Sequence, residues 1–133
     1  MRILIIEDEA SAVNRLRKML AELAPGSDVV ADVPSITAAV EWIKTNEAPD
    51  LALVDVQLAD GESFAIFERV QVDFPVVFTT AYDEHALRAF RVNALDYLLK
   101  PIRREELQQA LERAGRTRVV RDHASLARPM ADE

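Results

Sequence analysis

Five short apolar runs recur along the chain, and most of them are continuous rather than alternating. They lie at residues 3–6, 29–30, 51–54, 76–78 and 97–99. A strand that is buried on both faces has this pattern, because neither of its two rows of side chains meets water. The runs therefore predict five strands of a sheet that is covered on both sides.

The stretches between these runs carry apolar residues at the three- and four-residue intervals of a helix. The five stripes are formed by Val13, Leu16, Leu20 and Leu23, by Ile36, Ala39, Val40 and Ile43, by Phe64, Phe67 and Val70, by Ala86, Leu87 and Phe90, and by Leu107, Ala110, Leu111 and Ala114. Turn-forming pairs such as Pro25-Gly26 separate the elements, and Ser35 is expected to cap the second helix. The alternation of strand and helix predicts an α/β fold, a doubly wound (βα)5 sandwich of the flavodoxin-like type with a five-stranded parallel sheet.

The composition is that of a single globular domain. The chain has 133 residues, of which 50% are hydrophobic and 29% charged, and it has no cysteine. The lack of cysteine excludes thiol catalysis, disulfides and cysteine-bound metals. A net charge of −7 argues against a nucleic-acid-binding domain, because phosphate contacts require clustered Lys and Arg. No apolar run approaches the roughly 18 residues of a membrane span, so we expect a cytoplasmic protein without membrane contact.

The composition of the sequence changes after Gly115. Arginines become frequent there, and only one acidic residue, Asp122, precedes the acidic end at Asp132 and Glu133. A frayed helix end that leads into a solvated linker explains this pattern, since positive charge is favourable at a helix C-terminus. A basic arm that binds nucleic acid is the alternative, although no aromatic residues are interleaved there for base stacking. We therefore expect one domain over residues 1–116 and a C-terminal extension or linker over residues 117–133.

Residues that can carry chemistry, or that shape the chain beside them, follow four of the five predicted strands directly. They are Glu7 and Asp8, Asp55, Thr79 and Thr80, and Lys100 and Pro101. In a doubly wound sheet, ligands bind beyond the carboxyl ends of the strands, near the point where the strand order reverses. Each residue alone has a structural explanation, such as a helix cap, a backbone hydrogen bond or a solvated charge. Their coincidence at four strand ends favours a functional site.

The residue types in this group fit phosphoryl chemistry. Clustered carboxylates repel each other unless a divalent cation neutralises them, and Mg²⁺ prefers carboxylate, carbonyl and water oxygens. An ammonium and a hydroxyl beside such a cation would hold a tetrahedral oxyanion, and phosphoryl transfer depends mainly on positioning and charge neutralisation. Asp55 would be the nucleophile, because carboxylates form aspartyl-phosphates.

These motifs resemble the receiver domain of two-component response regulators over residues 1–116. They are the acidic pair Glu7-Asp8, the run Leu53-Val54-Asp55-Val56-Gln57-Leu58 followed by Asp60-Gly61, then Thr80-Ala81 and Lys100-Pro101. The stretches from Phe78 to Leu87 and from Asn93 to Ile102 are similar to the LytTR-type (LytR/AlgR) subgroup. The resemblance implies a phosphorylation-dependent signalling domain and not an enzyme, beyond its own phosphotransfer and dephosphorylation.

The resemblance assigns roles to the acidic residues and to Gln57. It implies that Asp55 is the phosphoacceptor and that Asp8 and Asp55 bind Mg²⁺ directly. The backbone carbonyl of Gln57 would be a further metal ligand, and Glu7 would act mainly through metal-bound water. Glu7 stands where the family often has aspartate, and glutamate is a common variant there.

The resemblance also assigns roles to the last two strands. Thr80 and Lys100 correspond to the groups that hold the phosphoryl oxygens. Tyr97 corresponds to the aromatic switch residue, whose ring follows the threonine inward. Pro101 corresponds to the proline that is usually preceded by a cis peptide bond, which aims Lys100 into the site.

Two classes of function are compatible with an aspartyl-phosphate. The first is a signalling module that receives the phosphoryl group from a sensor histidine kinase, and the second is a small hydrolase of similar fold. Such hydrolases need a second acid two residues after the nucleophile to act as general acid. Here that residue is Gln57, which cannot transfer a proton usefully, so the signalling module is favoured.

The expected partners are the kinase, a second copy of the chain and, indirectly, DNA. A homodimer with two-fold symmetry would use the face formed by the fourth predicted helix, the fifth predicted strand and the fifth predicted helix. The charges of both signs on this face are Arg88, Arg91, Arg103, Asp96, Glu105 and Glu106. LytTR-type regulators bind DNA through a C-terminal output domain that this chain lacks. We therefore expect either the receiver part of a transcription regulator or a stand-alone receiver that acts through protein–protein interaction.

Overall fold

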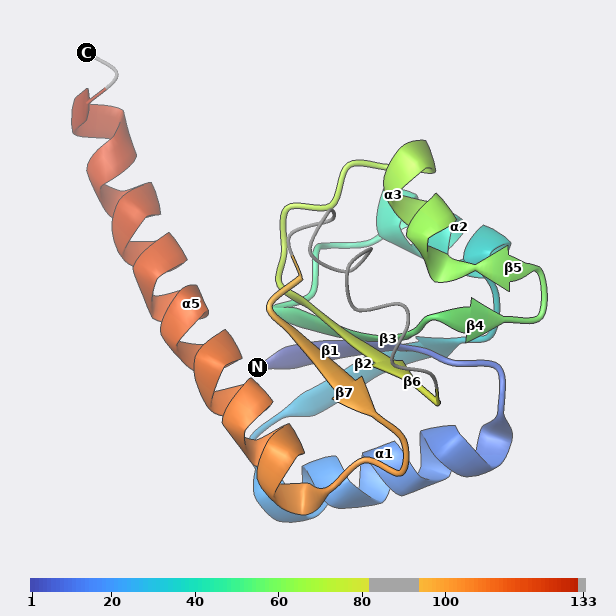
Figure 1. Ribbon diagram of the computed structural model, residues 1–133. Coiled ribbons are helices and arrows are strands. Elements are labelled where there is room, and N and C mark those ends of the chain that lie inside the picture. Colours follow the sequence, from blue (N-terminus) through green and yellow to red (C-terminus); the bar gives the residue numbers. More distant parts are fainter. Residues whose placement is uncertain (82–93, 132–133) are drawn as a thin grey trace.

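The computed structural model describes residues 1–81 and 94–131, with side chains as far as residue 117. Within these residues, five parallel strands form one sheet in the order β2-β1-β3-β6-β7 (Figure 1). The strands are β1 (Arg2–Ile6), β2 (Asp28–Val33), β3 (Leu51–Asp55), β6 (Val76–Thr80) and β7 (Asp96–Leu99). The predicted α/β fold with a five-stranded parallel sheet is confirmed.

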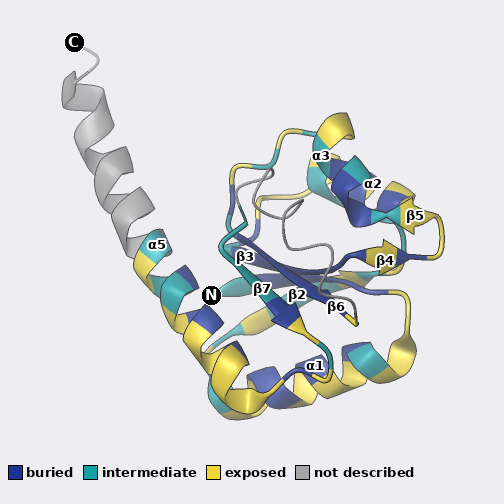
Figure 2. Ribbon diagram, in the orientation of Figure 1, coloured by how far each residue is buried: buried dark blue, intermediate teal, exposed yellow. Residues whose placement is uncertain are grey.

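The three central strands have the continuous burial that their apolar runs predict. All five residues of β3 and of β6 are buried, and so are the last four residues of β1 (Figure 2). The edge strand β2 has only partly buried and exposed positions, and the edge strand β7 has a single buried residue, Leu98. The centre of the sheet is therefore shielded from solvent, up to the strand ends that carry the candidate site residues.

Helices cover both faces of the sheet. They are α1 (Ala10–Leu23), α2 (Ile36–Thr45), the single-turn α3 (Ile66–Arg69) and α5 (Arg104–Ala131). Buried residues of α1 and α5 pack in one core cluster, whereas those of α2 and α3 pack in a second cluster on the opposite face (Figure 1). The helix expected around residues 86–90 lies outside the described residues.

The start of α2 agrees with its predicted cap. The side-chain oxygen of Ser35 accepts a hydrogen bond from the backbone N–H of Ala38 at 3.0 Å. This bond satisfies one of the N–H groups that a helix leaves without a partner in its first turn. The helix α2 begins shortly after β2 ends, so its first turn lies at the edge of the sheet where the parallel strands end.

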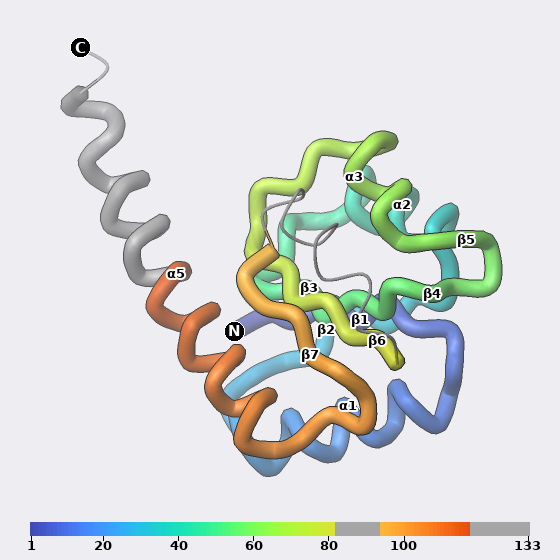
Figure 3. The backbone as a smooth tube through the Cα atoms, viewed as in Figure 1, coloured from blue at the N-terminus to red at the C-terminus, as the bar shows by residue number. Residues whose placement is uncertain are grey.

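The chain after β3 differs from the sequence prediction. It forms a small antiparallel hairpin of β4 (Gln57–Leu58) and β5 (Gly61–Glu62), visible in Figure 3 beside α2, before a 3-10 turn at Ser63–Ala65. The third predicted helix is consequently reduced to this turn and α3, and the chain is already extended at Val70. The hairpin escapes prediction because two residues per strand are too few to establish a hydrophobic period.

The fifth helix is longer than the sequence prediction. A frayed end was expected after Gly115, but α5 continues to Ala131. Arg and Ala, which have high helix propensity, are frequent in this stretch and outweigh the cost of a single glycine. The boundary between a domain over 1–116 and an extension over 117–133 stays a prediction.

Candidate functional site

The sequence-predicted site residues meet at one edge of the sheet. Glu7 follows the last residue of β1, Asp55 ends β3, Thr80 ends β6 and Lys100 follows β7. Strands β2 and β3 lie on opposite sides of β1, so the order of connection reverses between β1 and β3. This reversal is where open α/β sheets bind their ligands, and here it is flanked by Glu7 and Asp55.

Backbone hydrogen bonds fix each of these positions to the neighbouring strand. The N–H of Glu7 donates to the carbonyl of Val33 at 3.0 Å, and the N–H of Lys100 donates to the carbonyl of Thr80 at 2.7 Å. The residue after Asp55, Val56, donates to the carbonyl of Thr79 at 2.9 Å. Hydrogen bonds of the sheet therefore fix the backbone at three positions of the site, which gives the site a defined geometry.

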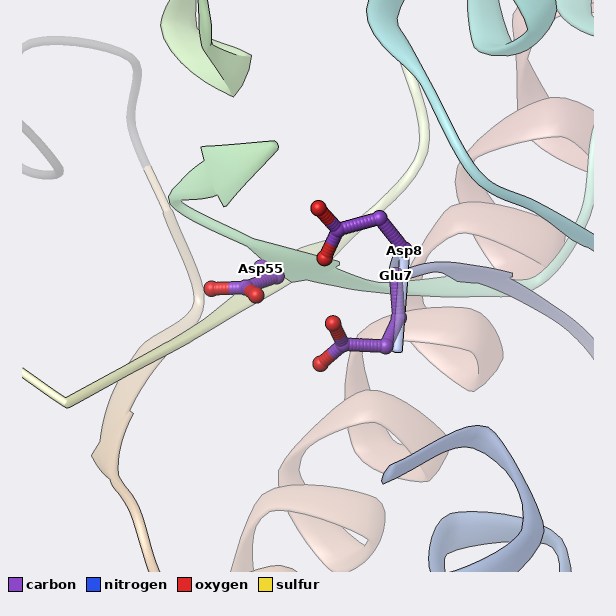
Figure 4. A group of neighbouring side chains, drawn as sticks. All are labelled: Glu7, Asp8 and Asp55. Carbon is purple, nitrogen blue, oxygen red and sulfur yellow. The ribbon is translucent and has the colours of Figure 1, made fainter. Parts of the chain in front are cut away.

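Three carboxylates share this edge. Glu7, Asp8 and Asp55 each provide an oxygen atom, and these atoms lie within 4.8 Å of one another (Figure 4). Glu7 is only 3% exposed and Asp55 only 6%, whereas Asp8 faces solvent. The group is thus closed toward the core and open to solvent on the side of Asp8.

The Lys100 ammonium lies between two of these carboxylates. Its Nζ donates to Oε1 of Glu7 at 2.7 Å and to Oδ2 of Asp55 at 3.2 Å. The peptide bond between Lys100 and Pro101 is cis, the isomer that the family resemblance implies. A further donor is the backbone N–H of Gln57, which reaches Oδ1 of Asp55 at 3.2 Å. Both oxygens of Asp55 are therefore oriented by hydrogen bonds.

Glu7 and Lys100 form an ion pair, and their surroundings favour the charged form of both groups. Burial raises the pKa of the Glu7 carboxyl, but hydrogen bonds from Lys100 and from the backbone N–H of Glu9 outweigh it and leave the pKa below its usual range. Burial likewise lowers the pKa of Lys100, but the carboxylates of Glu7 and Asp55 raise it above its usual range. Both groups are charged at neutral pH.

In Asp55 and Asp8, by contrast, the surroundings raise the pKa and disfavour the charged form. Burial, followed by the negative charge of Glu7, raises the pKa of Asp55 to about 6, against the opposing effect of Lys100. Partial desolvation and the neighbouring Glu7 also raise the pKa of Asp8. At neutral pH the three carboxylates and one ammonium retain two negative charges, and their donors are hard oxygens. This donor set fits a divalent cation such as Mg²⁺.

The two residues that the resemblance names as switch residues lie on the neighbouring strands β6 and β7. Thr80 is fully buried at the end of β6 and is adjacent in register to Leu99 of β7. Tyr97 of β7 is partly buried and packs against the core cluster on the α2 and α3 side of the sheet. Thr80 thus lies at the site edge, whereas Tyr97 is paired with Phe78, two residues before the end of β6, and the switch roles of both stay predictions.

One contact at the site was missed by sequence reasoning. Nη2 of Arg15 on α1 donates to the carbonyl of Ile102 at 2.9 Å and so holds the loop that follows Lys100. A cavity of about 270 Å³ lies between α1 and this loop and is lined by both residues and by Lys100. No sequence signal could identify the contact, because its acceptor is a backbone carbonyl far along the chain.

The charged face predicted for dimerisation is described only in part. Arg88 and Arg91 lie outside the described residues. The carboxylate of Asp96 accepts a hydrogen bond from Arg113 of the same chain, and Arg103 lies 4.0 Å from Glu106. Part of the charge on this face is therefore paired within one copy.

Among the described residues, no helix combines the length and the apolarity that a membrane span requires. The 28-residue α5 is long enough, but its composition is strongly polar.

The Asp55→Asn substitution is expected to stabilise the metal-free chain at pH 7. The folded pKa of Asp55, about 6, lies above its ordinary value of 3.8, so ionisation is unfavourable in the folded state. The difference corresponds to about 3 kcal/mol at pH 7 and to less than about 1 kcal/mol at pH 4, where the unfolded carboxyl also protonates. Urea unfolding with a chelator at both pH values measures this, with the exposed Asp73→Asn variant as control. Destabilisation at pH 7 would contradict the prediction.

The sequence of the chain matches the response regulator receiver domain family over residues 3–112. The sensory transduction protein LytT of Enterococcus faecalis is 36% identical over 120 residues, which cover 87% of this chain and 48% of that protein. The positive alginate biosynthesis regulatory protein of Pseudomonas aeruginosa is 35% identical over 136 residues, which cover 98% of this chain and 53% of that protein. The chain spans about half the length of the curated relatives it matches.

Solved structures agree with this assignment. The signal receiver domain of a modulated diguanylate cyclase from Desulfovibrio desulfuricans matches with a TM-score of 0.76 and 30% identity, over 90% of this chain and 97% of that chain. The response regulatory domain of protein mrkE from Klebsiella pneumoniae matches with a TM-score of 0.80 over 89% of this chain and 98% of that chain, and at 23% identity it shows the fold alone. The chain therefore belongs to the response regulator receiver domains, and its similarity to LytT and to the alginate regulator confirms the resemblance to the LytTR-type subgroup.

Proposed function

We propose that the chain accepts a phosphoryl group on Asp55 from a sensor histidine kinase in the cytoplasm. The observation that carries the proposal is the setting of Asp55 at the switch point of the sheet. Its carboxylate is buried, both oxygens accept hydrogen bonds, and Glu7 and Asp8 lie within reach of the same cation. A nucleophilic carboxylate, a lysine and a set of oxygen donors are the groups that phosphoryl transfer to a carboxylate uses.

Phosphorylation follows from this arrangement. A carboxylate oxygen of Asp55 attacks the phosphorus of a phosphohistidine, the P–N bond breaks, and its electron pair returns to the imidazole nitrogen, which takes up a proton. In dephosphorylation, water attacks the phosphorus, the bond to Asp55 breaks, and inorganic phosphate leaves. The Lys100 ammonium, already 3.2 Å from Asp55, would stabilise the charge that develops on the phosphoryl oxygens.

A bound Mg²⁺ would supply additional neutralisation of the phosphoryl oxygens. Asp8 and Asp55 would hold it through their carboxylates and Gln57 through its backbone carbonyl, whereas Glu7 would contribute mainly through water. Glu7 suits that indirect role because its Oε1 is already engaged by Lys100 at 2.7 Å. The open side of the group at Asp8 would allow the cation and the phosphodonor to enter.

The effect of phosphorylation on the rest of the chain would start at Thr80 and Tyr97, on the neighbouring strands β6 and β7. A phosphoryl group on Asp55 would attract the Thr80 hydroxyl, and the Tyr97 ring would follow inward on the neighbouring strand. Among the relatives are a transcriptional regulatory protein, LytR of Staphylococcus aureus, and the alginate regulator. We infer from these relatives that the receiver takes part in the control of transcription and acts through a DNA-binding output domain.

Phosphorylation is expected at Asp55 alone and only with Mg²⁺. Incubation with a small phosphodonor and Mg²⁺ should add one phosphoryl group, measured by mass spectrometry of the intact chain. Asp55→Asn should abolish the addition, and so should an excess of chelator. The Asp73→Asn variant, which changes an exposed aspartate away from the site, should react like the wild type. Equal labelling of Asp55→Asn would refute the assignment.

Lys100 is expected to matter for the phosphoryl group and not for metal binding. Its ammonium competes with a cation for Glu7 and Asp55, so Lys100→Ala should leave the Mg²⁺ affinity equal or slightly higher. The rate of phosphorylation should fall on the order of 100-fold, because one donor to the developing charge is lost. Calorimetric titration and phosphorylation kinetics measure the two effects, with the exposed Lys44→Ala as control. A large loss of Mg²⁺ affinity would show that Lys100 has another role.

Phosphorylation is expected to favour a dimer through the face that contains β7 and α5. A beryllofluoride mimic should tighten self-association about 5- to 150-fold, the range of a typical allosteric coupling. Sedimentation measures the shift with and without the mimic. Charge reversal of the exposed Glu105 and Glu106 should abolish it, whereas reversal of Glu41 on α2, across the sheet, should not. A shift that survives reversal of Glu105 and Glu106 would exclude this face.

A further inference from the structure

The hairpin after Asp55 contacts a distant helix through its tip. Oδ1 of Asp60 accepts a hydrogen bond from the backbone N–H of Ile36 at 2.9 Å, and Oδ2 accepts from the backbone N–H of Thr37 at 3.2 Å. The Thr37 hydroxyl lies 3.4 Å from the same Oδ2. These bonds, above all the one from Ile36, lower the pKa of Asp60, so it is ionised at neutral pH. Asp60 thus caps α2 from another element.

A second contact joins the same two elements. Gly61, at φ +136°, lies in the region that favours glycine, and a Cβ built on it would lie 3.3 Å from Cδ1 of Ile36. The hairpin backbone therefore packs directly on the first residue of α2. The neighbouring Leu58 is buried in the core cluster that includes Ile36. The hairpin is therefore held against the start of α2 by the hydrogen bonds of Asp60, by the close packing of Gly61 on Ile36 and by the burial of Leu58.

This capping is not required by α2 alone. Ser35 already supplies a local cap for the N–H of Ala38, as in an ordinary helix start. The hairpin, by contrast, has only two paired residues per strand, and an isolated two-stranded hairpin is marginally stable at best. The bonds between Asp60 and α2 therefore do more for the hairpin than for the helix.

The hairpin carries a residue of the phosphorylation site. Gln57 lies on β4, and its N–H donates to Oδ1 of Asp55. The base of the hairpin is fixed where the N–H of Ser63 donates to the carbonyl of Val56 at 2.8 Å. Gln57 therefore lies between two fixed points of the hairpin, the hydrogen bond of Val56 with Ser63 and the contact of Asp60 with α2. We propose that Asp60 is a positioning residue, which holds the hairpin so that the Gln57 backbone faces Asp55 and the bound metal.

This inference rests on the proposed function for its metal, but the link between Asp60 and Gln57 is independent of it. The test compares Asp60→Ala with Ser35→Ala, because both remove a cap of α2 and only the first releases the hairpin. In the metal-free chain, Asp60→Ala should shift the NMR resonance of the Gln57 amide, and Ser35→Ala should leave it in place. Asp60→Asn retains one acceptor oxygen and should give a smaller shift.

The Mg²⁺ affinity provides the functional readout. Asp60→Ala should raise the dissociation constant about tenfold, the lower end of the range for residues that orient metal ligands. Ser35→Ala should change it less than about twofold, although both variants lower the urea midpoint. Equal effects of the two variants, or no effect of either, would overturn the inference, because Asp60 would then be a helix cap only. If Asp60→Ala does not fold, Asp60→Asn decides by the same two readouts.

Failure of the proposed function has a different signature. If wild-type Mg²⁺ binding is insensitive to Asp8→Asn and Asp55→Asn, the metal does not bind at the proposed site. The Gln57 resonance in the metal-free chain still decides whether Asp60 positions the hairpin. If those two variants do weaken Mg²⁺ binding while Asp60→Ala behaves as wild type, only the inference about Asp60 is wrong.

Discussion

The mutual repulsion of three carboxylates at one end of a parallel sheet is the constraint on which this site depends. Glu7, Asp8 and Asp55 place oxygens within 4.8 Å of one another, two of them in nearly buried side chains. The Lys100 ammonium relieves part of this repulsion, mainly at Glu7, and leaves Asp55 with a pKa of about 6. Such an arrangement is unfavourable for folding, and groups held in this way occur where function requires them.

The fold tolerates this cost because the strands beneath the site consist mainly of apolar residues up to the edge where the site lies. The central strands β1, β3 and β6 are buried on both faces, and two separate clusters of aliphatic and aromatic side chains attach the helices to them. Hydrogen bonds between neighbouring strands hold the backbone directly at Glu7, Val56 and Lys100. A backbone movement that separates the charges would therefore break hydrogen bonds of the sheet, and the sheet opposes such a movement.

The features that the sequence predicted well are those encoded in contiguous residues. Continuous apolar runs predicted the five strands, and because the carboxyl ends of parallel strands meet, the polar residues after them were expected together. The β4–β5 hairpin was missed because its strands have only two residues each. The contacts of Asp60 with α2 and of Arg15 with Ile102 were missed because their partners are backbone groups far along the chain. Such contacts leave no pattern in side-chain type.

Both missed contacts hold a loop of the site against a helix, and the two helices lie on opposite faces of the sheet. Arg15 of α1 binds the loop that follows Lys100, and the start of α2 binds the hairpin that follows Asp55. The lysine and the aspartate that meet at 3.2 Å are therefore positioned by different layers of the fold. A change at Asp55 that moves the loop after Lys100 must alter the contact of that loop with α1, and one that moves the hairpin must alter the contact of the hairpin with α2. The structure thus connects the buried acidic group to both helical surfaces, through polar contacts that a purely apolar core could not direct.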